Sequence, residues 1–312
     1  MAFTILKQTV IMLILITTGI MCSKTGIISK NANRDLSKLV LQVVNPVMIF
    51  MSYQTAYRPE LVRNLLLTFA LSIGSILVTV AGAYLFVQRK EGREHEIERF
   101  SAIYSNCGFM GIPLIHALFD MEGVFYLTAF ITVFNIVVWT HGIILISGER
   151  SFDKVVKVFY SPTMISIALG LICFFFRLHV PAVPAQALGF ISDLNTPLAM
   201  IVSGVTMADT SIFKLIKKPR IYYVSMLRLV ILPFILSVLI SPLDISNKVK
   251  MTVVIAAAAP PAAMCTLQCI RYGKNSLYSS EIFTAGTIFS VLTLPAAVSF
   301  TEYLTNVMSR IC

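Results

Sequence analysis

Long apolar runs separated by short polar stretches make up the whole chain. A bilayer crossing needs about 17 to 25 mostly apolar residues in a helix. Because no polar stretch is long enough for a soluble domain, the pattern predicts an all-α integral membrane protein. It predicts ten spans, near residues 3–22, 36–54, 64–87, 100–119, 123–147, 158–177, 188–207, 220–240, 249–270 and 281–304.

Four of these predicted spans contain a helix-breaking sequence. Proline has no N–H to donate and clashes with the carbonyl four residues earlier, so each break frees backbone polar groups at membrane depth. Such groups are tolerated only where protein buries them or where they line a water-filled cavity. Any single break is also compatible with a packing kink, because proline and glycine are common in membrane helices. The structural breaks are Asn45-Pro46 in the second span, Gly111-Ile112-Pro113 in the fourth, Thr196-Pro197 in the seventh and Pro260-Pro261 in the ninth.

An internal repeat divides the chain into two halves, 1–148 and 149–312, with five predicted spans each. Because five is odd, the second half enters the membrane from the opposite side, which predicts an inverted repeat. The broken fourth and ninth spans are then symmetry mates. The matches at an offset of 151 residues are Gly19 with Gly170, Cys22 with Cys173, Pro46 with Pro197, and Ser52 with Ser203.

Composition agrees with a membrane protein and excludes most enzyme classes. Hydrophobic residues are 57% of the chain and charged residues 13%, and the mean hydropathy is +0.82. No nucleophile elbow, phosphate-binding loop or zinc-protease helix is present, so we expect no enzyme activity and no cofactor. Cys265 and Cys269 lie four residues apart but would supply only half of a metal site, so we expect no metal.

Basic residues predict the orientation, because Lys and Arg in short loops stay on the cytoplasmic side. Seventeen of them follow odd-numbered spans, whereas seven lie on the other face. We therefore expect a multi-pass protein of the plasma (inner) membrane with both termini on the extracytoplasmic side. The net charge of +10 then reflects topology and contact with anionic lipid, and no nucleic-acid partner is expected.

The broken fourth and ninth spans suggest a substrate site. Half-helix N-termini at mid-membrane carry partial positive charge, which favours an anion. Asn106 adds an amide that can donate to a carboxylate, and Arg228, inside the eighth span, can contact substrate or snorkel to the interface. Asn106 could instead form a hydrogen bond between helices, and for Asn135 helix packing is the alternative role. The candidate substrate-binding residues are Asn106, Cys107, Gly108, Gly111, Pro113, Asn135, Pro260 and Pro261, with Arg228 as a possible charge partner.

The run from Asn106 to Leu114, together with Asn45-Pro46 and Pro260-Pro261, resembles the auxin efflux carrier family of permeases over essentially the whole chain. The resemblance implies a sodium/proton-antiporter-like fold with crossed broken helices 4 and 9. It implies a scaffold of spans 1, 2, 6 and 7, a moving transport domain of spans 3–5 and 8–10, and a possible homodimer through the scaffold. The short central loop is similar to that of bacterial members, which are linked to malate, malonate and related carboxylates.

The expected function is therefore a secondary transporter that moves a small organic anion by alternating access. Two alternatives stay open: a cation-coupled or sodium/proton-antiporter-like carrier, and a membrane anion sensor that does not transport. A cation carrier would be expected to place acidic residues beside the breaks. The acidic residues considered fall instead in loops or at span ends: Asp35, Asp120, Glu122, Asp193, Asp209, Asp244 and Glu281.

Overall fold

The computed structural model describes residues 1–148, 159–208, 210 and 218–311. Within these ranges every regular element is helical, apart from one isolated antiparallel bridge between Ser105 and Pro261. The label η marks a π-helical turn, in which N–H groups bond five residues back. The first half contains α1 (Ala2–Lys24), α2 (Lys30–Leu39), η1 (Val40–Val44), α3 (Asn45–Ser52), α4 (Pro59–Phe86), α5 (His95–Ile103), η2 (Cys107–Gly111), α6 (Ile112–Val137), η3 (Val138–Gly142) and α7 (Ile143–Ser147). The second half contains α9 (Pro162–Phe175), α10 (Ala182–Asp193), α11 (Asn195–Met207), α13 (Pro219–Met226), η4 (Leu227–Ile231), α14 (Leu232–Ile240), α15 (Asn247–Ala258), α16 (Met264–Arg271) and α17 (Ser276–Ile311).

Several of these helices are those of a multi-pass membrane protein. Seven helical stretches in the described residues are long and apolar enough to cross a membrane, against the ten spans predicted. The seven are Phe3–Lys24, Lys30–Ser52, Pro59–Phe86, Cys107–Ser147, Ala182–Met207, Pro219–Ile240 and Ser276–Met308.

Three differences, which involve four of the predicted spans, account for the change from ten to seven. The fourth and fifth share the 41-residue stretch Cys107–Ser147, which is kinked at Asp120, where φ is 51°. The sixth corresponds to α9, an apolar helix of only 14 residues. The ninth corresponds to the two short helices α15 and α16, neither of which reaches membrane length by itself.

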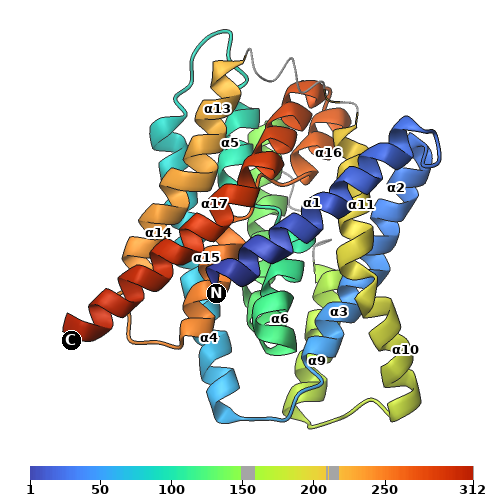
Figure 1. Cartoon of the computed structure of the whole chain (residues 1–312), viewed down its shortest axis with the longest axis vertical. Coiled ribbons are helices and arrows are strands. Elements are labelled where there is room, and N and C mark those ends of the chain that lie inside the picture. Colours follow the sequence, from blue (N-terminus) through green and yellow to red (C-terminus); the bar gives the residue numbers. More distant parts are fainter. Residues whose placement is uncertain (149–158, 209, 211–217, 312) are drawn as a thin grey trace.

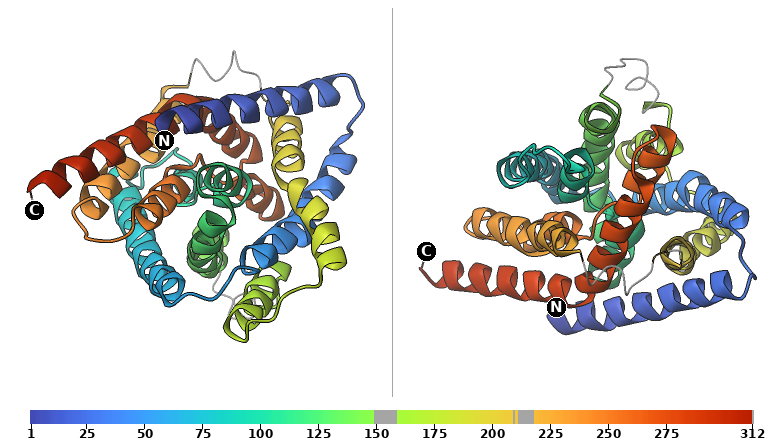
Figure 2. Two further views of the ribbon diagram at one scale, coloured as in Figure 1. Left: turned by 60° about the horizontal axis from the view of Figure 1, so that its bottom comes forward. Right: turned by 90° about the horizontal axis from the view of Figure 1, so that it is seen from above.

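The helices form a bundle around α6, which lies near its centre (Figures 1 and 2). The long helix α1 and the C-terminal part of α17 run along one face of the bundle, which Figure 2 shows from two sides. Residues Val124–Leu127 of α6 are fully buried, so the first large core cluster includes this helix. Helix α6 is therefore largely buried, whereas α1 and α4 lie at the periphery. Their exposed Leu, Ile and Phe side chains suit contact with lipid.

Three of the prolines that lie inside continuous helix share a local structure. Each follows a π-turn: η1 precedes Pro46, η2 precedes Pro113 and η4 precedes Pro233. The wider turn re-satisfies backbone groups that the proline ring would otherwise leave unpaired. The prediction that Asn45-Pro46 and Gly111-Ile112-Pro113 interrupt their spans is therefore wrong, because both are accommodated within continuous helix. At Thr196-Pro197 the interruption is the single residue Leu194, which separates α10 from α11.

Two true interruptions of the helices occur, one at an unpredicted position and one at the predicted Pro260-Pro261. Helix α5 ends at Ile103 and the chain resumes helical structure at Cys107, so residues 104–106 form the first interruption. Helix α15 ends at Ala258 and α16 begins at Met264, so residues 259–263 form the second interruption, which contains the predicted Pro260-Pro261. The first interruption holds no proline. It depends on an extended Tyr104 (φ −98°, ψ 119°), a conformation that local sequence does not reveal.

Candidate functional site

The two interruptions lie against each other and bond through their backbones. The N–H of Asn106 donates to the carbonyl of Pro260 at 2.7 Å, and the N–H of Ala262 donates to the carbonyl of Tyr104 at 2.9 Å. These bonds flank the bridge between Ser105 and Pro261. Each interruption therefore satisfies backbone groups that the other leaves free, which is what burial at membrane depth requires.

Arg228 joins both interruptions from a third helix. Its side chain is 1% exposed, so it does not snorkel to an interface. Nε donates to Ala259 O at 3.1 Å, Nη1 donates to Ala102 O at 3.1 Å and Ile103 O at 3.2 Å, and Nη2 donates to Ala257 O and Ala259 O. All these acceptors lie where α5 and α15 end. The guanidinium thus bonds to the partly negative C-terminal ends of two helices at once.

Asn106 sits at the start of the helix that follows the first interruption. Its carbonyl accepts from Met110 N–H at 2.9 Å and from Gly111 N–H at 3.3 Å, and its side chain is 6% exposed. The side-chain nitrogen Nδ2 is buried and has no hydrogen-bond partner within the described part of the chain. An unpaired buried donor is costly, about 1–3 kcal/mol, so this amide is a candidate for binding an acceptor from outside the protein.

A buried asparagine pair faces the same region from two other helices. Asn195, at the start of α11, donates from Nδ2 to Oδ1 of Asn45, at the start of α3. A side chain added at Gly108, in η2, would place its Cβ 3.9 Å from Nδ2 of Asn45, so the pair lies across from Gly108. Oδ1 of Asn195 is buried and unpaired among the residues described.

Sequence reasoning interpreted Asn45 only as a structural break and missed Asn195. A signal was present, because the two asparagines are 150 residues apart and each stands shortly before a proline. Polar residues at matching positions of the two halves, like the prolines beside them, therefore indicate candidate site residues.

The remaining candidate residues differ in how close they come to the interruptions. Cys107 and Pro113 are buried in the helix after the first interruption, and Gly111 faces Cys107 of its own helix. Pro261 packs against α17, since a Cβ on Gly286 would lie 2.4 Å from its Cδ. Asn135 is half-buried near the end of α6, and none of the contacts described above involves its side chain.

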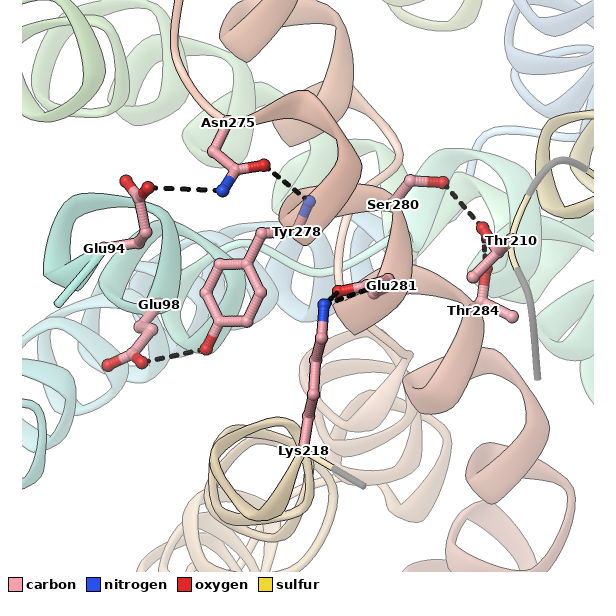
Figure 3. Close-up of polar contacts among 9 residues, drawn as sticks. All are labelled: Glu94, Glu98, Thr210, Lys218, Asn275, Tyr278, Ser280, Glu281 and Thr284. Atoms are coloured by element: carbon pink, nitrogen blue, oxygen red, sulfur yellow. Dashed lines mark hydrogen bonds and ion pairs between the residues drawn. The ribbon is translucent and has the colours of Figure 1, made fainter. Parts of the chain in front are cut away.

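A second polar cluster, which sequence reasoning did not identify, ties helix ends together (Figure 3). Glu98 of α5 is 1% exposed and accepts from Tyr278 at 3.0 Å and, through both oxygens, from Arg220 at 2.9 and 2.8 Å. Lys218 donates to Glu281 at 2.7 Å, and Thr210 bonds with Ser280 at 3.1 Å. These contacts connect α5, α13 and α17. Glu281 and Glu98 are therefore partners of cations and not free acids beside the interruptions.

A groove of about 440 Å³ lies elsewhere, between α13–η4 and α17. Its lining includes the exposed side chains of Tyr222, Tyr223 and Met226. Because it opens on an apolar outer surface and not on the interruptions, it is best explained as a lipid-facing recess.

Comparison with known proteins agrees with this picture. Residues 4–298 match the family described as "Membrane transport protein". The chain is 26% identical over 291 residues to an "Uncharacterized transporter" of Methanothermobacter thermautotrophicus, covering 91% of this chain and 94% of the relative. It is 20% identical over 296 residues to the "Uncharacterized transporter YfdV" of Escherichia coli K12, covering 91% and 93%. Since the family match spans nearly the whole chain, this protein belongs to the membrane transport protein family, the auxin efflux carriers that its sequence resembles, and is a transporter and not an enzyme.

Proposed function

We propose that this protein is a secondary transporter that moves a small organic anion, such as a mono- or dicarboxylate, by alternating access. The substrate binds where the two interruptions meet. The observation that carries the proposal is Arg228, a buried cation beside an unpaired amide donor, Asn106 Nδ2.

The charge of Arg228 is not cancelled by an acid. Its partners are backbone carbonyls, and it forms no ion pair with a carboxylate in the described ranges. Carbonyl dipoles stabilise the guanidinium but leave its formal charge in place. In a region screened from water that charge favours an anion over a cation.

Neutral donors supplement this charge. The first N–H groups of the helix that starts at Cys107 have no partner within that helix, and the helix dipole makes that end partly positive. Asn106 Nδ2 can donate to a carboxylate oxygen, and the Asn45–Asn195 pair offers further polar atoms across from Gly108. A carboxylate lying between η2 and this pair would be bound by several donors without any acidic neighbour.

We further propose that residues 1–148 and 149–312 are inverted repeats. Matching positions make matching contacts: a Cβ on Gly19 of α1 would meet Ile201 of α11, and a Cβ on Gly170 of α9 would meet Tyr53 of α3. In this arrangement α1, α2–α3, α9 and α10–α11 form the scaffold. The helices that carry the interruptions and Arg228 move against it as the transport domain.

Replacing Asn106 by alanine tests the site. We expect Asn106→Ala to lower uptake of a labelled dicarboxylate into proteoliposomes by about tenfold or more, because a hydrogen bond to a charged group contributes about 1.5–3 kcal/mol. Asn247→Ala is the matched control, since Asn247 is exposed at the start of α15. Unchanged uptake by Asn106→Ala at equal amounts of reconstituted protein would remove Asn106 from the site.

The substrate class is tested in the same vesicles. We expect dicarboxylates to compete with the labelled substrate and organic cations to leave uptake unchanged. Competition by cations alone would contradict an anion carrier.

A further inference from the structure

Arg228 uses its entire hydrogen-bonding capacity on the protein backbone. A guanidinium has five N–H groups, and Arg228 forms five hydrogen bonds: one from Nε, two from Nη1 and two from Nη2. No donor is left to hold a substrate. Its role in transport is therefore positioning and charge, and not direct contact.

The acceptors form a set of oxygens that would otherwise suit a metal cation. Ala102 and Ile103 close α5, whereas Ala257 and Ala259 close α15. The last carbonyls of a helix lack partners within the helix and carry partial negative charge. In transporters with broken helices, unwound carbonyls and half-helix C-termini coordinate the coupling Na⁺ or H⁺. Here the same kind of oxygens already surround a fixed cation.

The neighbouring carbonyls are occupied as well. Tyr104 O accepts from Ala262 N–H, and Pro260 O accepts from Asn106 N–H. Arg228 lies on η4, a π-turn between α13 and α14. The helix that carries this charge is therefore continuous at Arg228. A mobile cation entering this place would have to displace a covalently attached one.

We propose that Arg228 is a resident cation that replaces coupling Na⁺ at the C-terminal ends of α5 and α15, so that anion transport proceeds without Na⁺ bound at this place. The part concerning anion transport rests on the proposed function. The claim that Arg228 fills a cation site does not.

Thermal unfolding of the purified full-length protein tests the cation site directly. Melting is measured in sodium chloride and in choline chloride at equal ionic strength. We expect the wild type to melt at the same temperature in both salts. Arg228→Met, which removes the charge and leaves four buried carbonyls unpaired, should lower Tm by roughly 5 °C or more. Sodium, but not choline, should restore part of that loss.

Two further variants separate a cation site from simple destabilisation. Arg228→Lys keeps a charge and should remain insensitive to Na⁺. Leu232→Ala, one turn along the same bundle helix at a fully buried position, should destabilise by leaving a cavity without any sodium-specific recovery. Sodium-specific stabilisation of the wild type would overturn the proposal, as would the absence of sodium-specific recovery in Arg228→Met. If Arg228→Met does not fold, Arg228→Lys and the wild type decide: the proposal stands if both are insensitive to Na⁺ and falls if either responds.

Transport supplies an independent measurement. Uptake of a labelled carboxylate by wild-type proteoliposomes should have equal initial rates in sodium and choline media, and an absolute requirement for Na⁺ would overturn the proposal. If no carboxylate is transported in either medium, the proposed function fails, and the melting experiment alone then decides the role of Arg228.

Discussion

At the scale of single residues, the site combines one satisfied charge with unsatisfied amides. Arg228 is fully bonded, whereas Asn106 Nδ2 and Asn195 Oδ1 are buried without partners in the described structure. Insertion of an arginine at the membrane centre costs about 2.5–3.5 kcal/mol, so its retention needs a compensating role. The backbone carbonyls offset that cost, and the charge remains available to an anion. The proposed anion would accept a hydrogen bond from Asn106 Nδ2, whereas the unpaired Oδ1 of Asn195 is itself an acceptor and would not bind an anion.

The Asn45–Asn195 pair allows a prediction at this scale. We expect Asn195→Ala to destabilise the protein by about 1–3 kcal/mol, because it leaves Oδ1 of Asn45 buried and unpaired. The double variant Asn45→Ala/Asn195→Ala should cost less than the sum of the two single variants, since each removes the same bond. Melting temperatures of the four proteins measure this coupling. Strictly additive losses would show that the two side chains do not depend on each other.

At the scale of elements, close backbone contact decides which helices pair. A Cβ on Gly204 of α11 would lie 2.0 Å from the carbonyl oxygen of Ile16 in α1, and one on Gly19 would lie 2.2 Å from that of Ile201. Small residues allow membrane helices to approach this closely, because lipid removes the hydrophobic drive for helix association and leaves packing to provide it. The α1–α11 contact therefore requires glycine on both helices.

Gly204→Ala should consequently destabilise the protein by about 1–3 kcal/mol, because the two backbones must separate to admit the methyl group. Gly74→Ala in α4 is the matched control, since none of the described residues outside its own helix lies within 4 Å of the added Cβ. That change should be neutral or stabilising by up to about 1 kcal/mol, as alanine favours the helix over glycine. Thermal unfolding of both variants measures the difference, and equal effects would argue against the tight α1–α11 contact.

At the scale of the whole molecule, a charged cluster links helices of both halves of the chain. The polar cluster of Glu98, Lys218, Arg220 and Glu281 joins the N-terminal ends of α13 and α17 to α5, and Figure 3 shows the contact between Lys218 and Glu281. The basic residues in it belong to the face that the sequence predicts to be cytoplasmic. Salt bridges whose carboxylates are buried at these helix ends would hold α5, α13 and α17 together as one unit during a conformational change.

The orientation itself can be tested by cysteine labelling. In a variant without native cysteines, a cysteine added before Met1 should react with a membrane-impermeant maleimide in intact cells. Glu91→Cys, at an exposed position between α4 and α5, should react only after the membrane is permeabilised. The physical reason is the excess of Lys and Arg in the loops after odd-numbered spans. Protection of the N-terminal cysteine in intact cells would reverse the predicted orientation.

Apolar run length and composition by themselves determined that this is an all-helical, multi-pass membrane protein, because each apolar run must form a helix to satisfy its backbone in lipid. The motifs around Asn106 and Pro260 also determined the family, and the break at Pro260-Pro261 followed from proline chemistry. Only the tertiary structure decided that the first interruption lies at 104–106 and not at Pro113, because its backbone groups are satisfied by a segment about 155 residues away. It likewise decided the hydrogen-bond partners of Arg228 and Asn195. Their hydrogen-bond partners lie on other helices, and the local sequence does not indicate which helices will contact each other.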